Sequence, residues 1–589
     1  MKIIPLVLAV SSAFGANALS VTNIAAVHHD GQTFITWTDP ASGAAGANYR
    51  YKLYRSLSAI TNASSLAAAT LIQDGVSNNS GQMVGQFPYS QTTRQDSAKR
   101  MSIIQQGTCP GNAVCGTALS AFTGLAVHTA TANESAYYAV MTHDRTAALT
   151  DSPVSAGSNA TTSPVVETVA PIKPLKYFDS NDNTNRGPST STGITGAANL
   201  PLWVSLHGAG GCNAQLAFGD YWQYWWDNTG SWGGKPYQEG VQNVFSVQQT
   251  HSSATWGTPA IQINPCGEIW DPAYMASASI QSYYWGYLAL PLGSADPVAR
   301  ANAGLEPQWT WLTNWATSQF ATNPLKTYAY GFSMGAQGMV QWAIRHPELF
   351  AAVFPTAADW HPSRMATLST AAGTILTTQT LPDGTTQFLP ALDAITYVQS
   401  TCGTSPYIPP IIYGAERQDT SEASWAKQIE MHNALKACHM GYAWSWGNTA
   451  HSSAGINQVL PYYDAAYTKG VSYPAFTSSS IDNNIGNGST TDGDLTGCVN
   501  CGFFWSNVSE SSTTWTASVS NSLNKTAMTV DITPRNAQRF LLTPGRCVSW
   551  SASTGTTGTA VADAYGLATA VGVTMNPGMP TTITFTVVP

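Results

Sequence analysis

Charged side chains are scarce in this sequence. Only 10% of the 589 residues are Asp, Glu, Lys or Arg, against roughly 25% in ordinary soluble domains. The 24 basic and 32 acidic residues give a formal net charge of -8, and the basic residues form no cluster that could neutralise a run of phosphates. Charge-driven disorder is therefore excluded, and we expect no nucleic-acid partner.

Long apolar runs are also scarce. The run at 3–10 is far shorter than the about 20 residues that a membrane-spanning helix needs. It follows a basic residue, Lys2, and precedes the small-x-small sequence Ala-Asn-Ala at 16–18, a pattern typical of a secretory signal peptide. We expect residues 1–18 to be a signal peptide, the protein to be secreted (extracellular), and no segment to cross a membrane.

Cysteine is present in an odd number, nine, so at least one thiol is left unpaired. Secretion favours disulfides among the rest. The Cys498-x-x-Cys501 pair could also be half of a zinc site, but no second Cys/His pair follows at the required spacing. We expect neither a metal nor an organic cofactor.

The length predicts about three to five domains, at roughly 100 to 200 residues each. Residues 19–165 alternate apolar and polar side chains between turn residues, which predicts a β-sandwich. Through Trp37, the strand sequence YRYKLYRS at 49–56 and YYAV at 137–140, this segment resembles a fibronectin type III domain, with an insertion at about 85–130.

The rest of the chain divides in two. Residues 166–475 alternate strand, loop and helix patterns, which predicts an α/β domain with a mostly parallel sheet and helices on both faces. Residues 476–589 return to strand alternation and predict a C-terminal β-domain. We interpret the Gly/Asn/Asp-rich run at 482–494 as a flexible linker.

The sharpest chemical signal is Gly331-x-Ser333-x-Gly335, which a predicted strand precedes and a helical pattern follows. A nucleophilic serine needs a tight turn that exposes its oxygen, with small neighbours where strand and helix pass closely. Ser333 is therefore the candidate nucleophile, and the Met334 amide at the helix N-terminus is a candidate donor to an oxyanion.

A second donor is expected from the loop that follows the apolar strand at 202–206. The sequence His-Gly-Ala-Gly-Gly begins at His207, and the backbone amides of Ala209 and Gly210 are the candidates. We expect His207 to orient the loop rather than to transfer protons.

The base and the acid are expected downstream of the nucleophile. His451, in a loop with small neighbours after a strand, is the favoured base, with His361 as the alternative. The strand at 410–415 is followed by two carboxylates, of which Asp419 is the favoured acid and Glu416 the runner-up. The acid would hold the tautomer of the histidine.

These four segments resemble the α/β-hydrolase superfamily, in particular its secreted esterase and prolyl-oligopeptidase-like branch with feruloyl-esterase and polyhydroxybutyrate-depolymerase relatives. The resemblance rests on LHGAGG, GFSMGAQG, IIYGAERQD and WSWGNTAHS, and it covers about 200–470. It implies an α/β-hydrolase core and carboxylic ester hydrolysis through an acyl-enzyme.

Aromatic side chains are abundant, with 20 tryptophans. Many fall between 222 and 285, and we take Trp285, Trp360 and His207 as candidates for the substrate cleft. The expected function is a secreted serine esterase whose ester substrate is part of a polymer, a polyester or an esterified polysaccharide. The alternatives are a secreted serine peptidase and a non-catalytic polymer-binding or adhesion protein.

Overall fold

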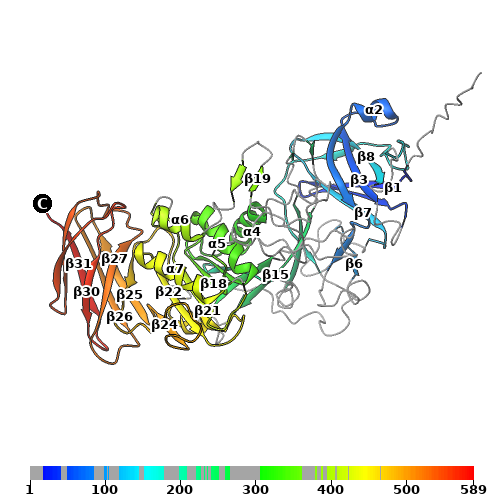
Figure 1. Cartoon of the computed structure of the whole chain (residues 1–589). Helices are drawn as coiled ribbons and strands as arrows, with labels where there is room; N and C mark the ends of the chain where they lie inside the picture. Colours follow the sequence, from blue (N-terminus) through cyan, green and yellow to red (C-terminus); the bar gives the residue numbers. More distant parts are fainter. Residues whose placement is uncertain are drawn as a thin grey trace, which may run out of the picture.

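The structure, a computed structural model, has three regions in chain order, and the α/β region lies between the other two (Figure 1). It describes residues 18–41, 49–84, 99–101, 104, 119–144, 151–177, 198–208, 220–226, 231–232, 235–236, 241–250, 259–265, 305–360, 378–380, 386–388, 394–404, 407–421, 423–463 and 466–589.

The N-terminal region consists of two antiparallel sheets around a core of its own. Side chains of both sheets meet there, among them Trp37, Tyr51 and Val140. The region therefore has the predicted sandwich layout, while its resemblance to a fibronectin type III domain stays a prediction. The sheets are β1 (Thr22–His29), β2 (Gln32–Thr38) and β7 (Thr123–Thr129), and β4 (Thr70–Ser77), β3 (Tyr49–Ser56), β8 (Glu134–Asp144) and β9 (Val165–Glu167); a short helix α2 (Ala63–Ala67) and a hairpin of β5 (Gln82–Val84) and β6 (Lys99–Met101) accompany them.

A ten-stranded sheet forms the centre of the molecule. Its six middle strands, from β16 to β22, are parallel, and the strands on both sides of them pair antiparallel. The predicted parallel sheet is thus present in the middle only. In sheet order the strands are β10 (Leu175–Tyr177), β12 (Asp220–Trp226), β15 (Val241–Thr250), β16 (Ala260–Pro265), β11 (Leu202–Leu206), β17 (Thr327–Phe332), β18 (Ala352–Thr356), β21 (Ile411–Glu416), β22 (Tyr442–Gly447) and β24 (Gly497–Val499).

The parallel strands are apolar on both faces. On β18, for example, Val353 lies in one hydrophobic cluster and the next residue, Phe354, in the other. The first face carries the longer helices of the region, α4 (Leu305–Gln319), α5 (Met334–Arg345), α6 (Ala394–Thr401) and α7 (Trp425–Ala437). Smaller elements complete the region: η2 (Pro347–Leu349) and the hairpins β13 (Ser231–Trp232)–β14 (Lys235–Pro236) and β19 (Thr378–Thr380)–β20 (Thr386–Phe388).

The second face of the sheet is covered mainly by the C-terminal strands. Trp515, Ile532 and Phe585 belong to the same cluster of buried residues as Trp203 and Phe354 of the central sheet. Among the described residues, the helical elements that join them there are the short turns η5 (Ala454–Gln458) and α8 (Leu460–Tyr463). The expectation of helices on both faces is therefore corrected for the described residues, because a β-layer buries the second apolar face.

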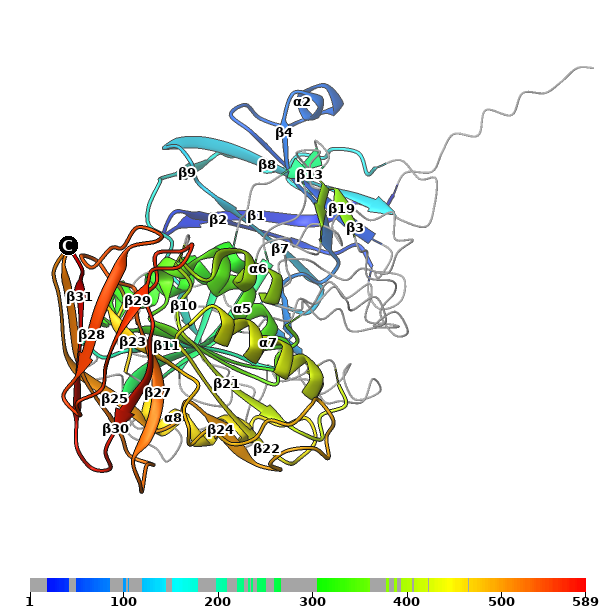
Figure 2. The ribbon, with the colours of Figure 1, turned by 60° about the vertical axis from the view of Figure 1, so that its left-hand side comes forward.

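The C-terminal strands form two antiparallel sheets that lie beside the α/β region in both views (Figures 1 and 2). The edge strand β24 also comes from this part of the chain but belongs to the central sheet. The chain after 476 therefore contributes one strand to the central sheet and the other strands to the C-terminal sheets. The sheets are β23 (Tyr473–Thr477), β27 (Met528–Arg535) and β30 (Ala570–Met575), and β25 (Phe503–Glu510), β26 (Thr514–Asn521), β31 (Thr581–Val587), β28 (Cys547–Ala552) and β29 (Thr557–Val561).

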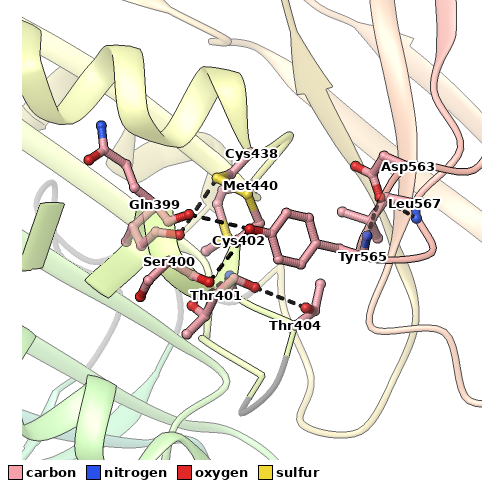
Figure 3. Close-up of a disulfide and its surroundings, with 12 residues drawn as sticks. Gln399, Ser400, Thr401, Cys402, Thr404, Cys438, Met440, Asp563, Tyr565 and Leu567 are labelled. Atoms are coloured by element: carbon pink, nitrogen blue, oxygen red, sulfur yellow. Dashed lines mark hydrogen bonds between the residues drawn. A yellow bond between two sulfur atoms is a disulfide. The ribbon is translucent and has the colours of Figure 1, made fainter. Parts of the chain in front are cut away.

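A buried arginine of the C-terminal strands reaches two helix ends that a disulfide links. Cys402 and Cys438 form a disulfide between the ends of α6 and α7. Arg535 of β27, only 1% exposed, donates from Nη2 to the carbonyl oxygens of Cys402 and Gly403, both at 2.9 Å. The hydroxyl of Tyr565 lies 3.5 Å from the carbonyl oxygens of Gln399 and Ser400 near the end of α6 (Figure 3).

The remaining cysteines fall into three groups. Cys498 and Cys501 are paired with each other, which argues against the zinc interpretation, and Cys547 is a free, exposed thiol. The other four, at 109, 115, 212 and 266, lie outside the described residues.

Replacement of Arg535 by Met should lower the free energy of unfolding by about 3 kcal/mol, since buried carbonyls would lose their donors. Urea unfolding measures the loss, and the exposed Arg539→Met is the matched control. Equal stability of the two variants would show that the contacts of Arg535 do not hold the layers together.

Candidate active site

Ser333 occupies the turn between β17 and α5. Its backbone has φ 53° and ψ -119°, in the left-handed half of conformational space that non-glycine residues rarely adopt. The turn is held at both ends, because the Ser333 amide donates to the carbonyl of Thr356 at 2.9 Å and its carbonyl accepts from the amide of Gln337 at 3.1 Å. This strained strand-to-helix turn is the one predicted from the Gly-x-Ser-x-Gly pattern.

The two glycines of the motif are required by close packing. A Cβ on Gly331 would lie 2.5 Å from the carbonyl oxygen of Gly335, and one on Gly335 would collide with the carbonyl of Leu206 on β11. Larger residues would therefore push helix α5 away from the sheet and displace Ser333.

Ser333, His451 and Asp419 form one chain of hydrogen bonds. The Nε2 atom of His451 lies 2.7 Å from the Ser333 Oγ atom, and its Nδ1 atom lies 2.6 Å from the Asp419 Oδ2 atom. The three residues follow the carboxyl ends of β17, β22 and β21, which are neighbours or near neighbours in the parallel part of the sheet. With Nδ1–H donated to the carboxylate, Nε2 is left to accept the proton of the serine.

The environment of Asp419 keeps this carboxyl ionised. Asp419 is 2% exposed, and burial alone would raise its pKa. Hydrogen bonds from His451, from the Ser421 side chain and from the Ser421 amide outweigh burial and hold the pKa of Asp419 below its usual value. The buried acid can therefore stabilise a charged imidazole.

Glu416, the runner-up acid, has a different contact. It is 1% exposed, and its Oε2 atom accepts the amide of Thr449 at 2.9 Å, two residues before His451. A Cβ on Gly447 would collide with the same carboxylate and displace it. Glu416 thus supports the loop that carries His451 rather than contacting the ring.

Arg417 binds the loop that carries Asp419 to the run 482–494. Its guanidinium, fully buried, donates to the carbonyls of Asp494 at 2.8 Å and Ser489 at 3.0 Å, and it lies over the ring of Trp425 at 4.8 Å. Burial lowers the pKa of Arg417. The run 482–494, interpreted above as a flexible linker, supplies the carbonyl acceptors of this arginine. A buried guanidinium needs such acceptors, and this one lies two residues from Asp419.

The predicted oxyanion donors fall into two groups. Met334 is the first residue of α5, so its amide is among those with no partner inside the helix. Ala209 and Gly210 lie outside the described residues. The residue just before them, Gly208, packs against Phe332 of β17, which places the start of their loop beside the turn that carries Ser333.

His207 is buried at the end of β11, with 2% of its surface exposed. Its Nδ1 atom lies 2.6 Å from the carbonyl oxygen of Gly208. Burial lowers its pKa to about 4. The ring is therefore neutral at neutral pH, and it bonds to the loop, in agreement with an orienting role.

One of the cleft candidates, Trp360, lies in the core and not at the site. Trp360 is fully buried, packs on Tyr413 and donates its indole N–H to Gln428 at 2.8 Å, so it is part of the core and is corrected as a cleft residue. His207 is buried as well. Trp285 and the alternative base His361 lie outside the described residues.

Sequence reasoning missed two residues of this region, Arg417 and Ser421. The Ser421 hydroxyl lies 3.0 Å from the His451 Nδ1 atom. An arginine and a serine in a loop carry no signature on their own, although an aspartate side chain often accepts the backbone amide two residues further on.

The described residues contain neither a cluster of metal-binding side chains nor a membrane-spanning helix. In these segments no three His, Cys, Asp or Glu side chains gather as a metal site would need. No helix there is long and apolar enough to cross a membrane.

Comparison with known proteins gives only distant likenesses. No family model and no curated protein matches the chain. Among solved structures, a ferulic acid esterase is 11% identical over 44% of this chain and 81% of its own, with a TM-score of 0.26. An S-formylglutathione hydrolase from Agrobacterium tumefaciens is 13% identical over 44% and 80%, with a TM-score of 0.29. Est1E from Butyrivibrio proteoclasticus is 10% identical over 45% and 85%, with a TM-score of 0.23.

Likenesses this weak carry no argument. The fold of the central region follows from its own strand order and from the position of its serine turn. A serine sits on the turn after a central parallel strand, and the loops of two further parallel strands meet it at the same edge of the sheet. The central region has an α/β-hydrolase fold. Three loops of this hydrolase fold supply the hydrogen-bonded chain.

The stability of the hydrolase region should fall between pH 6.5 and pH 4 because of His207. Its pKa is about 4 when folded and 6.5 by reference, so the unfolded chain binds the proton first and the stability present above pH 6.5 is lost as the pH falls. At about 1.4 kcal/mol per pKa unit, the loss is about 3 kcal/mol.

Thermal unfolding at pH 7 and pH 4 tests this. His207→Gln cannot bind the proton and should lose less stability on acidification than the wild type. His346→Gln, at a partly exposed position, is the control. An equal loss in wild type and His207→Gln would contradict the assignment.

Proposed function

We propose that the protein is a serine esterase in which Ser333, His451 and Asp419 form the catalytic triad. The hydrogen-bonded chain of these residues is the observation that supports it. Ser333 attacks the ester carbonyl while His451 takes the serine proton, and the proton then passes to the departing alcohol. Water then attacks the acyl-enzyme while His451 takes a proton from it. His451 returns this proton to the Ser333 oxygen, and the acid is released.

The developing oxyanion would be held by backbone amides. The Met334 amide at the start of α5 is one donor, and the amides of Ala209 and Gly210 are proposed as the other. Neither the attack nor the return of the proton in this scheme calls for a metal or an organic cofactor.

We further propose that the ester belongs to a polymer, such as a polyester or an esterified polysaccharide, and that the enzyme acts outside the cell. The proposal draws on the two β-regions beside the hydrolase region, for which hydrolysis of a small soluble ester has little use. The N-terminal one, with sheets of three and four strands, is proposed to be of the fibronectin type III kind.

Hydrolysis of short-chain nitrophenyl esters by the mature protein tests the main proposal. Release of nitrophenol should fall by several orders of magnitude in Ser333→Ala, since the variant keeps the site but lacks the nucleophile. Reaction with a serine-directed fluorophosphonate should disappear in the same variant.

Each other outcome points to an alternative. Fluorophosphonate labelling without ester hydrolysis, but with cleavage of chromogenic peptides, would identify a serine peptidase on the same triad. Folded protein that binds polymer and shows neither labelling nor hydrolysis would be a non-catalytic binding protein.

The identity of the acid is tested by a matched pair. Asp419→Asn should lose a factor of about 10⁴ in kcat, because the amide favours the wrong tautomer of His451. Glu416→Gln should keep most activity, since the Gln oxygen can still accept the amide of Thr449. Full activity in Asp419→Asn with loss in Glu416→Gln would reverse the assignment.

A further inference from the structure

A second oxygen approaches the nitrogen that binds Asp419. The Ser421 Oγ atom lies 3.0 Å from the His451 Nδ1 atom, and the Asp419 Oδ2 atom lies 2.6 Å from it. The imidazole therefore has two oxygen neighbours on the side away from Ser333, and both come from the loop after β21.

The backbone fixes the position of this hydroxyl. The Ser421 amide donates to the Asp419 Oδ1 atom at 2.8 Å, which closes a turn between the two residues. The Ala423 amide donates to the Ser421 Oγ atom at 3.3 Å. The turn thus places both the carboxylate and the hydroxyl against the same edge of the imidazole.

The hydrogen-bonding capacity of the hydroxyl fits this arrangement. A serine hydroxyl has one proton to donate and two lone pairs to accept with. The Ala423 amide takes one lone pair, the Nδ1–H of His451 faces the other, and the proton goes to the carboxylate of Asp419, whose pKa the Ser421 side chain helps to lower.

We propose that Ser421 is a positioning residue of the triad, a fourth member that acts through His451 and Asp419. Two acceptors at one N–H restrict rotation of the ring, which keeps Nε2 aimed at Ser333. The Oγ lone pair also stabilises the imidazolium that forms during attack. This inference rests on the proposed function, because it assigns Ser421 to the same site.

Variants at 421 separate this role from a structural one. Ser421→Ala should lower kcat for nitrophenyl esters about ten-fold with KM unchanged, as expected for one hydrogen bond to a charged group. The acid limb of the kcat/KM profile should move to lower pH, since a lone pair that favours the protonated ring is gone. Ser421→Thr keeps the hydroxyl and should restore most of kcat and the position of the limb.

A serine of the same loop supplies the control. Ser424, at the start of α7, makes no side-chain cap hydrogen bond, and Ser424→Ala should behave as the wild type. Thermal unfolding of all variants shows that they are folded. Wild-type kcat in Ser421→Ala, equal loss in Ser421→Thr, or equal loss in Ser424→Ala would each overturn the proposal.

Two further measurements distinguish a failure of the role of Ser421 from a failure of the proposed esterase function. The rate of fluorophosphonate labelling needs only the nucleophile and its base, so it should fall in Ser421→Ala whatever the natural substrate is. The downfield proton signal of the His451 Nδ1–H should shift in Ser421→Ala even if the wild type hydrolyses no ester of the panel. An unchanged signal together with an unchanged labelling rate would refute the role of Ser421 alone.

Discussion

The six parallel strands at the centre of the sheet are apolar on both faces, so both faces have to be buried against other parts of the chain. Helices α4 to α7 cover one face, and the C-terminal strands cover most of the other. Two cover layers of different kinds therefore rest on a single sheet. Because the strands end at the same edge of that sheet, their loops meet there, and the chain of Ser333, His451 and Asp419 depends on this packing.

The layers are joined through buried arginines whose acceptors are carbonyl groups. Arg535 reaches the loop at the Cys402–Cys438 disulfide, and Arg417 lies inside the run 482–494. In a chain with only 10% charged residues, these two arginines donate to backbone carbonyls. The consequence is that the loop with Asp419 is fastened to a segment that the pattern of the sequence places in another domain.

Local patterns were informative where the structure itself is local. The turn at Ser333 is defined by five consecutive residues and their flanking strand and helix, all visible in the sequence. Asp419 and Glu416 could not be separated in this way, because both lie at the carboxyl end of the same strand. Packing separates them: Glu416 lies against Gly447 and accepts the Thr449 amide, while Asp419 contacts the imidazole. Trp360 was misplaced for a similar reason, since an aromatic side chain suits a cleft and a core equally well.

The sequence by itself determined the strand, turn and helix around Ser333, the alternation of α and β elements, and the β-character of both flanking regions, because each depends on neighbouring residues. Tertiary structure decided which carboxylate meets His451, which layer covers the second face of the sheet, and that Ser421 and Arg417 belong to the site. These depend on contacts between segments far apart in the chain, which burial and hydrogen-bond geometry select and which no local pattern records.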